Sequence, residues 1–281
     1  MAEEYKGDIG LYLSGQPVKV ASSGLFITQP KIKDIVVVSN ENEFMSAVQL
    51  LSHIDRFANS IKEGNSVLED MPDFQIIIEV LRQKSGQFYN LINSFFQLCM
   101  PDFDFQCSKH SLDFTVRGED TIVGMLNAFN YNDFALTIEE LFVPRGKEEE
   151  PEYHIDESDA LSRRLLEKIK RNRAALAKQR AAKEGENISI FGLYTSSLSI
   201  GLGMDINTFY NYTPFQLYDA FNRFLAKMQR DKYESMLMIP FADVSKVQEH
   251  EPPSWLENLY KPTEETYNSL QKLNSVGSTA K

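Results

Sequence analysis

Two adjoining stretches of opposite charge lie near the middle of the chain. Residues 144–160 are acidic and contain prolines and a glycine, which discourage regular structure. Residues 161–186 are rich in Lys, Arg, Ala and Leu, a composition that favours a helix. We therefore expect two folded modules separated by a linker and a basic helix. The predicted divisions are an α+β module over 1–143, the acidic linker over 144–160, the basic helix over 161–186, a helical module over 187–241, and a mostly flexible tail over 242–281 with a short amphipathic segment.

The first 143 residues mix strand-like and helix-like patterns. Strand character is expected from residue 11, with runs at 18–20 and 25–27 flanking a Ser/Gly loop, and Ser111–Val116 alternates like a strand. Residues 30–38 are compatible with a short helix or an extended strand. Apolar spacing predicts helices over 40–62, from about residue 73, over 88–98, and as one or two helices over 120–142. The last prediction places Ile122, Met125, Leu126 and Phe129 on one helical face.

The region 187–241 reads as a compact helical module. A first helix is expected over 188–202, ended by glycines. The segment Thr213–Gln216 offers an N-cap hydroxyl, a proline at the first helical position and a capping-box glutamine, so a second helix should start there and run to about Met238. Its expected apolar face is Phe215, Tyr218, Phe221, Leu225 and Met228. The predicted fold class is mainly α, with a small α+β N-terminal module and a C-terminal helical module.

The sequence contains no recognisable catalytic motif. Cys99 and Cys107 do not form a C-x-x-C pair, and the four histidines have no partner at metal-ligand spacing. Gly201-Leu202-Gly203 lacks the third glycine and the preceding strand of a dinucleotide fingerprint. We therefore predict that the chain is not an enzyme and that it uses no metal and no cofactor.

The net charge and the hydropathy of the chain limit the kinds of partner that it is expected to bind. The net charge of −11 opposes general coating of nucleic acid and adhesion to anionic lipid. No stretch approaches the roughly 18–20 apolar residues that would span a bilayer, and the first ten residues lack an apolar signal core. We expect a cytoplasmic protein that works by binding other proteins.

Two segments are candidate partner-binding sites. The basic helix offers Arg164, Lys168, Arg171 and Lys178 to an acidic protein surface or to nucleic acid, although it could instead pair with the acidic linker beside it. In the tail, a capping-box helix carries Trp255, Leu256 and Leu259, which could dock into a groove of a partner or fold back onto the chain's own core.

Three regions of the chain resemble a known family. They are the strand at Gly15–Val18 followed by Ile27–Ile35, the Arg/Lys-rich helix in the middle, and Phe209–Leu217 with its continuation Phe224–Gln229. In this order they resemble the tail assembly chaperones of long-tailed bacteriophages of Gram-positive hosts.

The resemblance implies a role in tail assembly in the host cytoplasm. Such a chaperone would bind the long helices of the tape-measure protein, keep them soluble and recruit tail-tube subunits. The resemblance is compatible with a homo-oligomer. Two alternatives stay open: a structural virion protein, as a tail or connector subunit, and a nucleic-acid-binding regulator that uses the basic helix.

Overall fold

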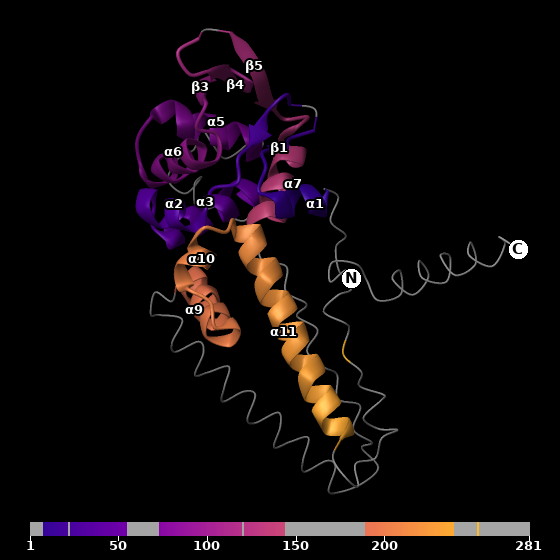
Figure 1. Ribbon diagram of the computed structural model, residues 1–281. Coiled ribbons are helices and arrows are strands. Elements are labelled where there is room, and N and C mark those ends of the chain that lie inside the picture. Colours follow the sequence, from indigo (N-terminus) through magenta and orange to yellow (C-terminus); the bar gives the residue numbers. More distant parts are fainter. Residues whose placement is uncertain are drawn as a thin grey trace, which may run out of the picture.

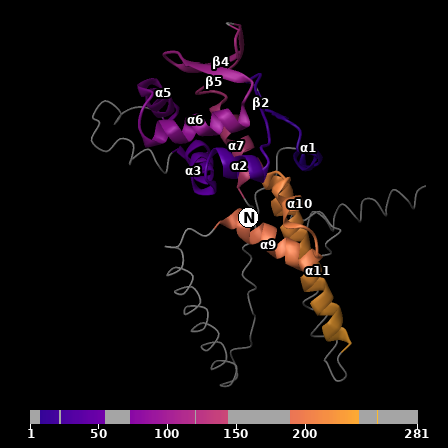
Figure 2. The ribbon, with the colours of Figure 1, turned by 60° about the vertical axis from the view of Figure 1, so that its left-hand side comes forward.

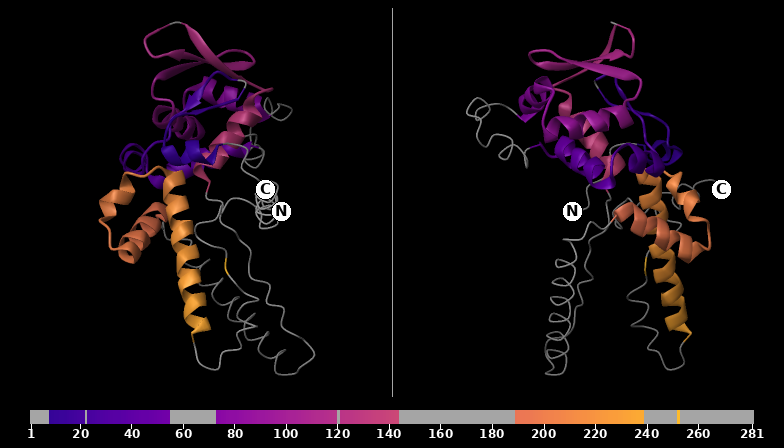
Figure 3. Two further views of the ribbon diagram at one scale, coloured as in Figure 1. Left: turned by 45° about the vertical axis from the view of Figure 1, so that its right-hand side comes forward. Right: turned by 90° about the vertical axis from the view of Figure 1, so that its left-hand side faces the viewer.

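The computed structural model describes residues 8–21, 23–54, 73–119, 121–143, 189–238 and 252. Residues 8–143 within these ranges form what we call the body, and residues 189–238 form what we call the arm. A small sheet caps one end of the body, and the arm leaves the opposite end (Figures 1 and 3). The fold is mainly helical with two small antiparallel sheets, which confirms the predicted fold class.

Six described helices build the body. They are α1 (Ile9–Ser14), α2 (Ile32–Val38), α3 (Glu41–Ser52), α5 (Asp73–Gln83), α6 (Gln87–Cys99) and α7 (Tyr131–Phe142). The predicted apolar stripe of α3, Phe44 to Ile54, is buried, and so is the stripe Phe74 to Leu81 of α5. Asn40 caps α3 by accepting a hydrogen bond from the backbone N–H of Glu43.

The strands form two separate sheets. β1 (Val18–Lys19) pairs antiparallel with β2 (Phe26–Ile27), as the two strand-like runs predict. The second sheet has the order β3–β4–β5, with β3 at Phe103–Cys107, β4 at Ser111–Val116 and β5 at Ile122–Asn127. Helix α6 packs against this sheet, because the Phe96 ring lies 5.2 Å from that of Phe105 and 5.5 Å from that of Phe114.

Aromatic side chains fill the centre of the body. Phe44 of α3, Phe95 of α6 and Phe142 of α7 are buried, and their ring centroids lie 5.3 to 6.0 Å apart. Tyr12 of α1 donates a buried hydrogen bond of 2.7 Å to Glu140 of α7, which gives that buried carboxylate a partner. Three helices thus meet in one interior that the apolar spacing largely predicts.

Three of the sequence-based predictions for the body are wrong in part. Residues 122–127 form strand β5 and not a helix, because pairing with β4 overrides a helix-like spacing; of the four predicted face residues only Leu126 is buried. Ile9–Ser14 is a helix and not part of a strand-rich region, since Asp8 caps its first turn and Gly15 ends it in the left-handed conformation. The predicted helix over 40–62 is interrupted, because α3 ends at Ser52; residues 55–62 lie outside the described residues.

The arm contains α9 (Ile190–Leu202), α10 (Ile206–Tyr210) and α11 (Pro214–Leu237). The capping box at Thr213 and Gln216 is present at the start of α11, as predicted. Asp205 caps α10 and Gly203 ends α9 in the left-handed conformation. The predicted apolar face of α11 is wrong in its second half, because Leu225 is 40 % exposed and Met228 is 53 % exposed.

Polar contacts and a shared core fix the arm to the body. Glu41 of α3 accepts hydrogen bonds from the Ser189 hydroxyl and from the backbone N–H of Phe191, 3.0 Å away, at the start of α9. Gln216 donates to the carbonyl of Leu13, 2.7 Å away. One buried apolar cluster continues from the body to residues of α9, α10 and α11. Among the described helices, none combines the length and apolar character that a membrane crossing requires.

Candidate docking surface on the helical arm

Helix α9 carries no charged residue. One of its sides packs on α11, where Tyr194 stacks on Phe221 with ring centroids 4.1 Å apart and planes 10° apart. Gly201 allows the next contact, because a Cβ at this position would overlap the ring of Phe224. Leu198, between them on the same side, is fully buried. The aromatic residues therefore hold α9 and α11 together along one seam.

The other side of α9 also carries apolar side chains, which are exposed and lie beside Ser196 and Ser197. We call the exposed residues Ile190, Leu193 and Ile200 the α9 strip; they follow one another at intervals of three and seven residues and so share one side of the helix. Leu193 is 52 % exposed and Ile200 is 85 % exposed. A helix that is apolar on all sides is normally covered on all sides. Apolar patches of this kind on a soluble chain mark interaction surfaces.

Helix α11 continues the apolar surface beyond its contact with α9. The side of α11 that presents Phe221 to α9 goes on to Leu225, Met228 and Met236, which are exposed. We call these three residues the α11 extension. Figures 1 and 2 show that α11 reaches further from the body than α9 does. A partner helix could therefore lie along a surface that α9 leaves open.

Charged side chains of α11 pair along the helix. Lys227 contacts Asp231 at 3.1 Å and Arg230 contacts Glu234 at 3.0 Å, both four residues apart. Such exposed pairs add little stability, but they keep this part of α11 solvated. An apolar surface rimmed by solvated charges is the usual composition of a protein-binding site.

Two tyrosines in the arm have raised pKa values. Burial raises the pKa of Tyr218 and of Tyr194, so both phenols are protonated at neutral pH. Across the residues that the structure describes, no group of three or more His, Cys, Asp or Glu could hold a metal ion. The chemistry that this surface offers is therefore apolar contact.

The residues that the sequence singles out lie elsewhere. Arg164, Lys168, Arg171 and Lys178 of the basic helix fall outside the described residues, as do Trp255, Leu256 and Leu259 of the tail and the whole acidic linker. The sequence reasoning missed the α9 strip, although its signal was visible. An uncharged helix with apolar residues on two sides can pack against a partner on each side. The packing of α11 on α9 leaves the side with the α9 strip exposed.

No known protein family matches the chain, and neither a curated protein nor a solved structure matches it.

Proposed function

We propose that the chain is a tail assembly chaperone of a long-tailed bacteriophage, acting in the host cytoplasm. In this role it binds amphipathic helices of the tape-measure protein through the arm and recruits tail-tube subunits. The observation that supports the proposal best is the α9 strip, an exposed apolar side on a helix without charges. The resemblance at Phe209–Leu217 and Phe224–Gln229 falls on the same arm.

The geometry of the strip favours a helical client. Its residues lie on one side of a regular helix, and an amphipathic helix presents a matching row at i, i+3, i+4 and i+7. Fully burying a large apolar side chain contributes about 1.5–3 kcal/mol. Several such residues can therefore hold a client, while the cost of ordering both partners keeps the complex reversible. Reversibility is what a chaperone needs when the tube polymerises around its client.

The test uses the tagged full-length chain in infected cells. Capture should retain the tape-measure protein, identified by mass spectrometry, and the chain should be absent from purified particles. The double variant Leu193→Glu with Ile200→Glu should lose this capture, because it places two charges on the strip. Gln49→Glu with Asn132→Glu is the matched control, since it adds the same charge at two exposed positions of the body.

Two results would contradict the proposal. Equal capture by the double variant and the control would mean that the strip does not bind the client. Stoichiometric amounts of the chain in purified particles would instead identify a structural tail or connector subunit.

A further inference from the structure

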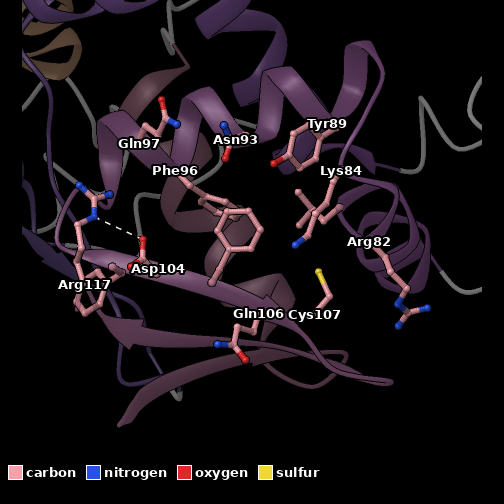
Figure 4. Close-up of a pocket in the computed structure, with 13 residues that line it drawn as sticks. Arg82, Lys84, Tyr89, Asn93, Phe96, Gln97, Asp104, Gln106, Cys107 and Arg117 are labelled. Atoms are coloured by element: carbon pink, nitrogen blue, oxygen red, sulfur yellow. Dashed lines mark ion pairs between the residues drawn. The ribbon is translucent and has the colours of Figure 1, made fainter. Parts of the chain in front are cut away.

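A second open surface lies at the other end of the molecule, beside the edge strand β3. A cavity of about 650 Å³ is lined by β3, the end of α5 and α6 (Figure 4). All five consecutive residues from Phe103 to Cys107 line it. Neighbouring residues of a strand point to opposite faces of the sheet. A cavity that touches all five therefore runs along the edge of the strand. We call this space the β3 groove.

The backbone of β3 offers unpaired groups to this groove. The ladder between β3 and β4 continues at both ends, where the N–H of Arg117 bonds the carbonyl of Asp102 and the N–H of Ser108 bonds the carbonyl of Ser111. Hydrogen-bonded pairs alternate in an antiparallel ladder, so Asp104 and Gln106 also bond β4. The N–H and C=O groups of Phe105 and Cys107 therefore point away from β4, and no described strand pairs with them.

The charge of the groove is opposite to that of the whole chain. Its lining includes the cations Arg82, Lys84 and Arg117 and a single carboxylate, Asp104. Arg117 contacts Asp104 at 3.5 Å, and Arg82 pairs with Glu79 and donates to the carbonyl of Ser108. No described carboxylate lies within ion-pairing distance of Lys84. The groove thus carries an excess of positive charge on a chain whose net charge is −11.

The rest of the lining suits a peptide backbone. Figure 4 shows Asn93 and Gln97 on α6, across the groove from β3, with Phe96 between the two walls. Amide side chains both donate to and accept from a peptide. Burial raises the pKa of the Cys107 thiol even though Arg82 and Lys84 lower it, so the thiol stays neutral and does not offset the cations.

We infer that the β3 groove binds an extended, acidic segment of a partner protein, which adds to the sheet as a further strand beside β3. The open backbone groups of Phe105 and Cys107 pair with the segment, and Lys84 with its neighbouring arginines selects acidic side chains. Five strand residues span about 17 Å, so a short segment is sufficient. This surface and the arm lie at opposite ends of the molecule, and the inference does not depend on the function proposed for the arm.

The first test varies the peptide and leaves the full-length chain unchanged. The probe is a short fluorescent peptide that alternates glutamate with valine, measured by fluorescence anisotropy. We expect it to bind, and we expect N-methylation of every second backbone amide to weaken binding at least about tenfold. N-methylation removes the donors that strand addition requires and leaves the charge unchanged. A peptide with lysine in place of glutamate should also bind at least about tenfold more weakly.

The second test varies the groove. Lys84→Glu should weaken binding of the acidic peptide at least about tenfold, and Lys109→Glu is the matched control because Lys109 is exposed and does not line the groove. Cys107→Pro removes an edge N–H that β4 does not use, and Cys107→Val keeps it. Only the proline variant should lose binding, and circular dichroism checks that both variants fold.

Three outcomes would overturn the inference. They are absence of binding at about millimolar peptide, equal binding of the N-methylated peptide, and tighter binding of a single-stranded oligothymidine that competes with the peptide. The second would leave only a charge effect, and the third would identify the groove as a site for nucleic acid.

Discussion

Helices α6 and α9 have the same length and the same lack of charged residues, but they differ in how far their apolar side chains are buried. Each has 13 residues, and neither contains a charged residue. Helix α6 lies between α3 and the three-stranded sheet, and none of its large apolar side chains is exposed. Helix α9 is covered by α11 along one seam and leaves Ile190, Leu193, Ile200 and Leu202 exposed. The same composition thus forms an interior in the body and an open surface in the arm.

The difference lies in how the polar residues are placed. On α6 the exposed positions are Gln87, Asn90 and Gln97, so the helix has one polar side for solvent. On α9 the serines and Thr195 are spread around the helix, and Thr195 is fully buried, with its hydroxyl donating to the carbonyl of Phe191. A helix without a single polar side can pack on both sides, and in the described part of the chain α11 and α10 contact α9 but leave the α9 strip exposed.

The largest effect on stability is expected for a substitution in α6, the helix that is fully packed in the body. Phe95→Ala should lower the free energy of unfolding by about 3–5 kcal/mol, because it removes a ring that contacts Phe44, Phe96 and Phe142 and leaves a cavity. Urea unfolding measures the loss. A decrease below about 1 kcal/mol would mean that the centre of the body is not packed as described.

The next effect tests the seam that covers α9. Gly201→Val should lower the free energy of unfolding by about 1–3 kcal/mol, because its side chain would overlap the Phe224 ring and force α9 away from α11. The control is Ser197→Val, which places the same side chain on the same helix away from the seam. Near-ultraviolet circular dichroism should report a change in the aromatic environment for the first variant alone.

A smaller effect is expected at the start of α11. Thr213→Ala should cost about 0.5–2 kcal/mol, because it removes the oxygen that accepts from the N–H of Gln216, 3.3 Å away. Thr208→Ala is the control, as Thr208 lies in α10 and takes part in the cap there only through its backbone carbonyl, which the substitution keeps. Equal unfolding midpoints for the two variants would contradict the assignment of Thr213 as the cap.

Local signals in the sequence predicted the helices that carry their own caps. The cap at Thr213 and the end at Gly203 involve atoms only a few residues apart, so a local sequence pattern is enough to predict them. Strand β5 was missed because its conformation depends on β4 and because the backbone of Met125 bonds the carbonyl of Ser23. Gly124 lies so close to Leu25 and Ser23 that a side chain there would not fit. The contacts with Ser23 and Leu25 join residues about a hundred positions apart, and no local pattern reports them.

The candidate surfaces were harder to predict than the fold. The apolar residues of α9 were visible in the sequence, but whether a side chain is covered depends on the helices around it. The β3 groove could not be predicted, because its cations come from the end of α5, from the turn that follows α5 and from the turn after β4, and its edge becomes open only through the strand order. The Arg/Lys-rich helix was the most obvious charged feature, and it lies outside the described residues.

The smallest effect on stability is expected for a substitution on the exposed side of α9. This substitution also tests most directly whether α9 differs from α6 in its packing. Ile200→Ser should change the free energy of unfolding by less than about 0.5 kcal/mol, because a side chain that is mostly exposed in the folded chain gives up little burial. Leu198→Ser, two residues earlier on α9, should cost several times more, since Leu198 is fully buried and its replacement leaves both a cavity and a polar group in the seam. Urea unfolding of the two variants measures the contrast, and capture of the tape-measure protein measures the function of the exposed side.

If Ile200→Ser is as destabilising as Leu198→Ser, the outer side of α9 is packed within the chain itself, and α9 is an interior helix like α6. If Ile200→Ser leaves stability unchanged and weakens capture, the exposed side of α9 exists for a partner, which is the property that separates the two helices.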